Sequence, residues 1–328
     1  MNKQYLKDSL IKISATCARC IPTFIWNPLK HRWIDQPRRV KLGIDSGATP
    51  LFDTVFFEVR TRCNGKCPFC AASIQNEKRQ DTTMPMDLYV KVINELKDMR
   101  FDGRIAYHVN NDPLIFHKLP DFVKYARTAL PSAWIQILTN GKALTEQKAE
   151  DLLAAGINEL SINYYNDDQS SEVPKVIDNI SKNILPCYYE KHQIKTGHDS
   201  KNKNIFRFNV FRSKLNIVKT SRAGTAPNKK VKSKQPRGFC EYPFTQFNIT
   251  ADGKVSKCCA DLYFSDPMGN VKEYSLMEIW NGKRFQEVRK LLLEGNRSAI
   301  ETCSKCDFYG VKKSYMSKIA KFICINTQ

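Results

Sequence analysis

The sequence predicts an α/β protein, in which a partial (β/α)6 barrel of the TIM type precedes a small C-terminal α+β domain. From about Leu51 onward, strand-like and helix-like segments alternate, which is the pattern of a parallel sheet with crossover helices. The strands recur at regular spacing, as they do in barrels. Beyond Gly238 this alternation gives way to turns and short strands. The chain therefore divides into two unequal parts.

Each predicted element has its own local signal. The apolar strands are residues 54–59, 103–109, 133–138, 159–165 and 205–211. The intervening helices are residues 82–99, 119–130, 145–156 and 173–184. In the first helix Thr83 is the expected cap and Pro85 lies in the first turn, whereas Thr145 and Gly156 should begin and end the third. Functional groups should gather where the strands end.

The C-terminal part begins with turn-rich sequence. Residues 251–255, "ADGKV", predict a hairpin, and residues 275–295 predict one helix that leads to "CSKC". The expected organisation is a basic N-terminal extension, the partial barrel, the smaller domain and a basic C-terminal tail, at residues 1–50, 51–228, 229–310 and 311–328.

Composition indicates a globular protein of a reducing compartment. The chain has 328 residues, of which 42% are hydrophobic, and it contains 12 cysteines. The apolar run at residues 20–26 is too short to span a bilayer, so we expect a cytoplasmic protein without a transmembrane segment. Cysteines in such a compartment are metal ligands, redox groups or buried side chains more often than disulfides.

The formal net charge of +19 is concentrated in one segment. Residues 185–238 hold fourteen Lys or Arg against two acidic residues. One interpretation is a solvated basic loop that ends in "NKKVKSKQPR". The other is a contact surface for an anionic substrate, an acidic peptide or phosphates. The sequence leaves both open.

Three cysteines in the stretch "TRCNGKCPFC" predict an open metal site. Cys63, Cys67 and Cys70 have C-x3-C-x2-C spacing and follow the first strand directly. A structural site closes its coordination shell with four protein ligands, whereas a catalytic site leaves one position for substrate. Ligation by thiolates alone favours an iron–sulfur cluster or zinc.

This arrangement resembles the radical S-adenosylmethionine (SAM) superfamily, in which an aromatic residue, here Phe69, often precedes the last cysteine. The resemblance implies a 4Fe-4S cluster on the three cysteines, with SAM bound at the open iron. It further implies one-electron cleavage of SAM to a 5′-deoxyadenosyl radical that abstracts a substrate hydrogen. The cofactor carries that chemistry, while the protein positions and shields it.

The resemblance extends to the ends of the next two strands. "NNDPL" stands where the family has its Gly-Gly-Glu-Pro segment, and "TNG" stands where many members carry that tripeptide near the ribose and methionine. It therefore implies SAM contacts from Asn110, Asn111, Asp112, Pro113, Thr139 and Asn140, together with Phe69. Asp112 replaces a glutamate, and Asn140 could equally serve a simple turn.

Three further features are candidates for the same site. "SRAG", residues 221–224, resembles a segment before the second domain of many relatives. Arg207 or Arg212 could pair with the SAM carboxylate, but each could equally be a solvated strand-edge arginine. His108 is a candidate for the barrel interior, although a lone strand histidine is more often a satisfied core residue.

A second set of four cysteines predicts a closed site. Cys240, Cys258, Cys303 and Cys306 would converge from a loop, a hairpin and a C-x2-C knuckle, and their spacing alone suits zinc as well as iron. The surrounding segments "CEYPF", "ITADGKVSKCCAD" and "CSKC" resemble the SPASM/Twitch domain of radical SAM enzymes. That resemblance implies an auxiliary 4Fe-4S cluster. Cys259 could replace Cys258, whereas "CARC" at Cys17 and Cys20 is too weak a motif to assign.

An auxiliary cluster beside a radical site indicates an oxidation, because it can accept the second electron from a substrate radical. Relatives with one such cluster include aminocyclitol dehydrogenases, so we expect two-electron oxidation of a sugar, cyclitol or similar small polar or anionic substrate. Modification of a peptide or protein side chain is the alternative. A reducing donor such as flavodoxin or ferredoxin is implied, and the catalytic acid and base are not identified.

A non-enzymatic zinc protein that binds nucleic acid through residues 185–238 is the minor alternative. Its interleaved Tyr and Phe residues could stack on bases. The open first site and the strand–helix alternation favour an enzyme, so nucleic acid is an unlikely partner.

Overall fold

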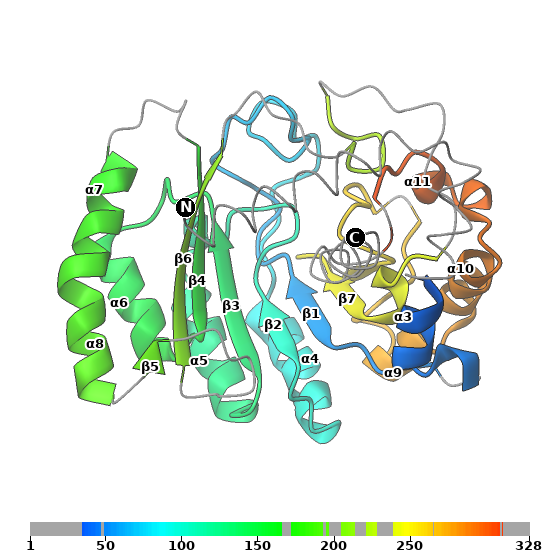
Figure 1. The fold of residues 1–328 in the computed structure, drawn as a ribbon, viewed down its shortest axis with the longest axis horizontal. Helices are drawn as coiled ribbons and strands as arrows, with labels where there is room; N and C mark the ends of the chain where they lie inside the picture. Colours follow the sequence, from blue (N-terminus) through cyan, green and yellow to red (C-terminus); the bar gives the residue numbers. More distant parts are fainter. Residues whose placement is uncertain are drawn as a thin grey trace, which may run out of the picture.

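A single sheet organises the part of the chain that the computed structural model describes (Figure 1). That part comprises residues 35–46, 49–165, 172–192, 195–196, 205–213, 221–227, 239–264, 266–308 and 310. Within it the nine strands run in the order β5-β6-β4-β3-β2-β1-β7-β8-β9. The predicted "CARC" motif, the "NKKVKSKQPR" segment and the C-terminal tail lie outside the described residues.

Seven strands are parallel, and the last two turn back as hairpins. The parallel strands are β1 (Thr54–Phe57), β2 (Arg104–Ala106), β3 (Trp134–Thr139), β4 (Glu159–Tyr165), β5 (Lys195–Thr196), β6 (Ile205–Ser213) and β7 (Gln246–Ile249). The antiparallel strands are β8 (Lys254–Ser256) and β9 (Gly269–Asn270). All five predicted barrel strands are confirmed, as is the hairpin at residues 251–255.

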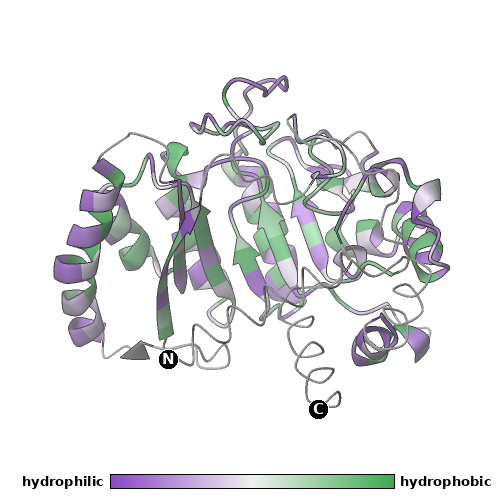
Figure 2. Cartoon of the chain, turned by 45° about the horizontal axis from the view of Figure 1, so that its top comes forward, coloured by the Kyte–Doolittle hydropathy of each residue, from purple (hydrophilic) through white to green (hydrophobic). Residues whose placement is uncertain are grey.

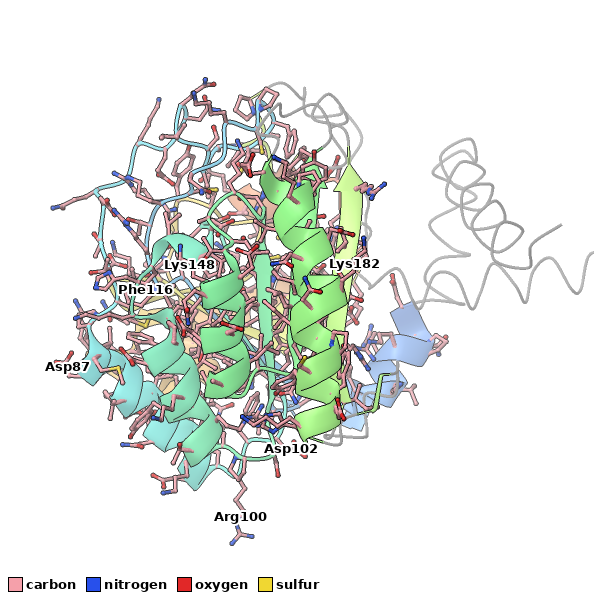
Figure 3. The ribbon with its side chains drawn as sticks, turned by 90° about the vertical axis from the view of Figure 1, so that its left-hand side faces the viewer. Asp87, Arg100, Asp102, Phe116, Lys148 and Lys182 are labelled. Carbon is pink, nitrogen blue, oxygen red and sulfur yellow. The ribbon has the colours of Figure 1, made fainter. Side chains whose placement is uncertain are left out.

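Helices cover one face of the parallel strands, and Figure 3 looks onto them. They are α4 (Met86–Asp98), α5 (Leu119–Ala129), α6 (Glu146–Ala155), α7 (Glu172–Asn179) and α8 (Leu185–His192), with the π-helical η4 (Ile180–Ile184) between the last two. The remaining α-helices are α3 (Gln36–Lys41), α9 (Leu276–Trp280), α10 (Lys283–Leu293) and α11 (Glu301–Ser304). This parallel-strand, helix-covered arrangement confirms the α/β class and is that of a partial barrel.

Three helical segments differ from the prediction, and one of them is the helix expected at residues 173–184, which continues through η4 and α8 to His192. Thr145 does cap α6, accepting from Lys148 N, and Gly156 ends it at φ 96°. Thr83, however, pairs with Arg60 in an isolated bridge, so α4 begins after Pro85. The predicted helix at residues 275–295 is two helices. A Cβ at Gly282 would lie 2.8 Å from the Glu278 carbonyl oxygen, and the chain bends there instead.

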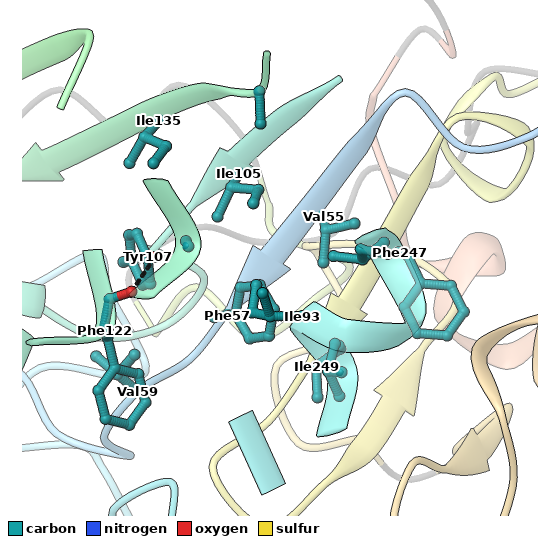
Figure 4. Packing of buried hydrophobic residues seen from close by; sticks show 14 of the residues in the cluster. Val55, Phe57, Val59, Ile93, Ile105, Tyr107, Phe122, Ile135, Phe247 and Ile249 are labelled. Atoms are coloured by element: carbon teal, nitrogen blue, oxygen red, sulfur yellow. Dashed lines mark hydrogen bonds between the residues drawn. The ribbon is translucent and has the colours of Figure 1, made fainter. Parts of the chain in front are cut away.

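Alternate strand residues build a continuous core on the helix-covered face. Val55 and Phe57 of β1 pack in one cluster with Ile105 of β2 and with Phe247 and Ile249 of β7 (Figure 4). The central strands are hydrophobic in Figure 2, and the outward surfaces of the helices are largely hydrophilic. No helix among the described residues is long and apolar enough to cross a bilayer.

The C-terminal part extends the same sheet. Strand β7 pairs in parallel with β1, with Thr54 opposite Gln246 and Phe57 opposite Ile249. Phe247 also packs against Phe52 and Trp280, at ring-centroid distances of 5.0 and 6.1 Å. The two parts of the chain therefore share a sheet and a core, and both present strand ends to one edge.

Replacing Phe247 with alanine should destabilise the protein by about 3–5 kcal/mol, because the cavity would open in this shared core. The matched control is Phe211→Ala on β6, where the ring is 52% exposed and the expected loss is about 1 kcal/mol or less. Urea unfolding followed by circular dichroism measures both. Equal losses in the two variants would contradict the shared core.

Candidate active site

The first three cysteines lie on a loop that follows β1, above the strand ends at the top of Figure 1. Local turns shape this loop, because Cys70 N donates to Cys67 O at 3.1 Å and Ile74 N donates to Gly65 O at 2.9 Å. A Cβ at Gly65 would lie 3.3 Å from Cys63 Sγ and 3.6 Å from Cys67 Sγ. Gly65 therefore lies directly against two of the three sulfurs, which brings Cys63 and Cys67 together on the same side of the loop.

A buried charge cluster holds the base of this loop. Glu58, which is 0% exposed, receives two hydrogen bonds of 2.9 Å from Arg79, and Arg79 also donates to Glu77 at 2.8 Å. Burial raises the pKa of Glu58 to about 7, while the Arg79 guanidinium opposes that rise. Because the carboxylate precedes the cysteines and the arginine follows them, this cluster closes the loop.

Asp112 joins the ends of β2 and β3. Its carboxylate accepts from Thr139 Oγ1 at 2.9 and 3.0 Å, from Asn140 N at 2.8 Å and from Leu114 N at 3.0 Å. Burial raises the pKa of Asp112, and the hydrogen bonds from the Asn140 and Leu114 amides and the Thr139 hydroxyl oppose that rise. Since a carboxylate has about four acceptor sites, Asp112 chiefly positions its neighbours.

Asn140 connects this network to the cysteine loop. Its Nδ2 donates to Asn64 Oδ1 at 2.8 Å and lies 3.5 Å from Cys63 Sγ, while its Oδ1 accepts from Lys142 N. The other predicted contact residues are close by in the fold. Asn111 bonds to the backbone of residues 107 and 109, Pro113 starts the short helix η3 (Pro113–Ile115), and the Phe69 ring packs 5.8 Å from Tyr165.

Arg222 is a charged residue at this edge. The sequence resemblance covered its segment, "SRAG", but did not single out this residue individually. It donates to Asn110 Oδ1 at 3.0 Å, and its other terminal nitrogen lies 4.0 Å from Cys70 Sγ. Residues 222–224 all have positive φ, at 44°, 53° and 82°. Such backbone strain in non-glycine residues marks sites where geometry matters.

The two arginines proposed for the SAM carboxylate lie at opposite ends of β6. Arg207 is opposite Glu159 at the start of β4, and its guanidinium is stacked 4.5 Å from the Trp134 ring. It is therefore at the end of the sheet away from the cysteines. Arg212 lines a separate pocket with Tyr164 and Asp178. Arg207 therefore does not fit the predicted role, whereas Arg212 lies near the carboxyl end of β6, and its pairing with the SAM carboxylate stays a prediction.

Several buried polar atoms face the side of the sheet away from the helices. Among the described residues, His108 Nδ1, Asn110 Nδ2 and both amide atoms of Asn248 have no hydrogen-bond partner. Asn248 pairs with Phe56, whose ring contacts His108 edge-on at 5.4 Å. Burial lowers the pKa of His108 to about 3, so its ring is neutral. Buried groups without a hydrogen-bond partner call for an explanation, such as an ordered water, an ion or a polar ligand.

The second set of cysteines also converges. Cys240, Cys258, Cys303 and Cys306 line one small pocket of about 30 Å³. Cys259 is not among its lining residues. Cys306 N donates to Cys303 O at 3.2 Å, and Phe308 N donates to Cys306 Sγ at 3.4 Å. Four thiols around one cavity fit a closed cluster site.

The loops that carry the two cysteine sets are in contact with each other. Ala71 and Ala72, which follow Cys70, pack against Leu262, which follows the Cys258 hairpin. Burial raises the pKa of Cys63 and of Cys303 to about 12. Buried thiols of this kind become thiolates when a metal supplies the opposing charge.

No group of three described His, Cys, Asp or Glu residues is close enough to share a single metal ion. Clustered cysteines at the carboxyl ends of parallel strands are the arrangement that the sequence predicts for an enzyme with an open and a closed metal-cluster site.

Sequence comparison identifies both parts. Residues 57–181 match the Radical SAM superfamily, and residues 240–307 match SPASM, an iron–sulfur cluster-binding domain. The chain is therefore a radical SAM enzyme with a C-terminal SPASM-type domain. It is an oxidoreductase that uses two 4Fe-4S clusters and SAM.

Known relatives agree with this assignment. The S-adenosyl-L-methionine-dependent 2-deoxy-scyllo-inosamine dehydrogenase of Niallia circulans is 26% identical over 262 residues, which cover 80% of this chain and 95% of the relative. The crystal structure of BtrN in complex with AdoMet and 2-DOIA has a TM-score of 0.65 at 25% identity, over 80% of this chain and 96% of that one. Streptococcus suis SuiB bound to precursor peptide SuiA shares the fold, with a TM-score of 0.52 at 13% identity, over 85% and 75%.

Replacing Arg79 with methionine should leave Glu58 buried without its partner, which costs about 3–5 kcal/mol, and should lower iron binding at the first site. Arg60→Met is the matched control, because its ion pair with Asp81 is partly exposed and contributes about 1 kcal/mol or less. Urea unfolding and iron analysis measure the two effects. Wild-type stability and iron content in Arg79→Met would refute this role.

Proposed function

We propose that Cys63, Cys67 and Cys70 hold the SAM-binding cluster and that Cys240, Cys258, Cys303 and Cys306 hold the auxiliary cluster. The position of Gly65 against the sulfurs of Cys63 and Cys67 supports the first assignment. The pocket that the other four cysteines share supports the second. The absence of Cys259 from that pocket lining favours Cys258 as the hairpin ligand. When bound, the first cluster and SAM supply a 5′-deoxyadenosyl radical that takes a hydrogen atom from the substrate.

The residues at the strand ends would position SAM. Asp112 fixes the turn that carries Thr139 and Asn140, and Asn140 in turn contacts the cysteine loop. Asn110 has an unpartnered Nδ2 among the described residues, so it can donate to the methionine part of SAM. Asn111, Pro113 and Phe69 would then shape the surrounding pocket.

We infer that the reaction is the two-electron oxidation of an alcohol on a sugar, cyclitol or similar small polar substrate. The observation that carries this inference is the similarity along almost the whole dehydrogenase of Niallia circulans, both domains included. Arg222 and the unpartnered groups of His108 and Asn248 support it, because a polyol offers donors and acceptors for each of them.

The oxidation accounts for two electrons and two protons. The alcohol would lose one hydrogen atom from its carbon, one further electron and the hydroxyl proton. The 5′-deoxyadenosyl radical would supply the acceptor for the hydrogen atom, the auxiliary cluster the acceptor for the electron, and water the acceptor for the proton. Contact between Ala71, Ala72 and Leu262 joins the loops that carry the two cysteine sets. A one-electron donor such as flavodoxin or ferredoxin would reduce the first cluster, in the reducing environment of the cytoplasm.

Alanine at Cys63, Cys67 and Cys70 should abolish SAM cleavage while leaving about four irons per chain at the second site. Alanine at Cys303 and Cys306 is the matched control. It should remove the second set of irons, preserve reductive SAM cleavage and impair substrate oxidation. Iron analysis and chromatography of 5′-deoxyadenosine measure both. Persistent cleavage in the first variant would refute the assignment of the open site.

Substrate class can be tested with the reduced holoenzyme and a panel of aminocyclitols and sugars. One carbonyl product should form for each 5′-deoxyadenosine, and deuterium at the oxidised carbon should appear in that nucleoside. A peptide panel is the comparison, since the PqqA peptide cyclase of Streptomyces rochei is 23% identical over 36% of this chain and 31% of its own. Turnover of peptides alone would overturn the polyol proposal.

A further inference from the structure

The wall of the second cysteine pocket carries two cations. Lys257 and Arg297 are the charged residues that line it, and no carboxylate of the described residues does. Both are almost fully buried, the Lys257 side chain at 1% exposure and Arg297 at 4%. Buried charges are costly and call for an explanation beyond solubility.

Lys257 lines the pocket, and its ammonium group is held by side chains next to the second set of cysteines. It directly precedes Cys258, and its Nζ lies 3.5 Å from Thr302 Oγ1, on the residue before Cys303. The ammonium also pairs with Asp261 at 2.9 Å, and Asp261 is 4% exposed. Thr302 lines the pocket but Asp261 does not. Asp266 also lies 3.7 Å from the ammonium, and it too is absent from the pocket lining. Lys257 is therefore the member of this ionic cluster that reaches the cysteine pocket, and its two carboxylate partners lie outside it.

Arg297 approaches the pocket from the other side. Its guanidinium donates to Phe308 O at 2.6 Å and to Phe239 O at 3.0 Å. Phe239 precedes Cys240, and Phe308 is two residues beyond Cys306. The positive charge is thus fixed between the two chain segments that bring these cysteines together.

Charges placed this way affect a redox couple in one direction. A 4Fe-4S cluster with four thiolates is negatively charged, and it gains one more negative charge on reduction. A nearby cation stabilises the reduced state more than the oxidised state, and low dielectric strengthens the effect. No bond forms or breaks in the protein, and one electron enters the cluster.

We propose that Lys257 and Arg297 raise the midpoint potential of the auxiliary cluster. The higher potential would favour transfer of the second electron from the substrate radical to that cluster. The inference rests on the proposed ligand set and on the proposed oxidation. It assigns to Lys257 a positioning and electrostatic role, with Asp261 as the partner that keeps the ammonium buried and charged.

The test uses the full chain with Cys63, Cys67 and Cys70 replaced by alanine, so that the second cluster alone reports. Lys257→Gln keeps the length of the side chain and removes its charge, and Asp261→Asn removes the charge behind it. Lys254→Gln is the matched control, because Lys254 lies on the same hairpin and pairs with Asp252 in solvent. Redox titration followed by electron paramagnetic resonance measures each midpoint potential.

We expect a more negative midpoint in Lys257→Gln, a more positive one in Asp261→Asn and no shift in Lys254→Gln. An unchanged midpoint, or the opposite signs, in the variants that retain iron would overturn the proposal. Loss of iron from both Lys257→Gln and Asp261→Asn would show a folding role instead, which also overturns it. Absence of iron in the parent background would refute the ligand set, a result read from iron content alone.

Discussion

The parallel pairing of β1 with two partners is the constraint on which the rest of the structure depends. Strand β1 pairs with β2 on one side and with β7 on the other. The first pairing places the cysteine loop beside Asp112 and Asn140, and the second brings the C-terminal cysteines to the same edge. Because all three strands point the same way, residues from distant parts of the chain meet above their carboxyl ends.

Charge placement distinguishes the two cysteine sites. At the first site, Arg79 and Glu58 lie at the base of the loop, and Arg222 contacts both Asn110 and Cys70. At the second site, two buried cations lie in the wall itself. The first arrangement holds a loop in shape and leaves one side open to SAM and substrate. In the second arrangement, positive charge lies beside the four cysteines.

Local patterns in the sequence were enough for the fold class, the five barrel strands and the hairpin. The caps at Thr145 and Gly156 are short-range features, and the cysteine spacing predicts an open site and a closed one. The break at Gly282 was also local, but the amphipathic pattern on either side of it concealed the two helices. Element identity therefore follows largely from neighbours in sequence.

Long-range partners could not be predicted in this way. The pairing of β7 with β1 joins segments about 190 residues apart, and the hairpin signal says nothing about it. Arg222 meets Asn110 across 112 positions. From the sequence, Lys257 would be expected on the surface of a basic protein. The structure shows that its side chain is buried beside Cys258. Charged residues are seldom placed in a core from sequence, because their burial depends on partners that folding alone brings together.

The central claim is that this chain holds two iron–sulfur clusters, one open and one closed. It is tested most directly by measuring iron, sulfide and zinc in anaerobically reconstituted protein and then analysing the products after reduction with SAM. We predict about eight irons per chain, no stoichiometric zinc, and 5′-deoxyadenosine as the cleavage product. Zinc at the second set of cysteines, or no cleavage of SAM by iron-loaded protein, would contradict the account.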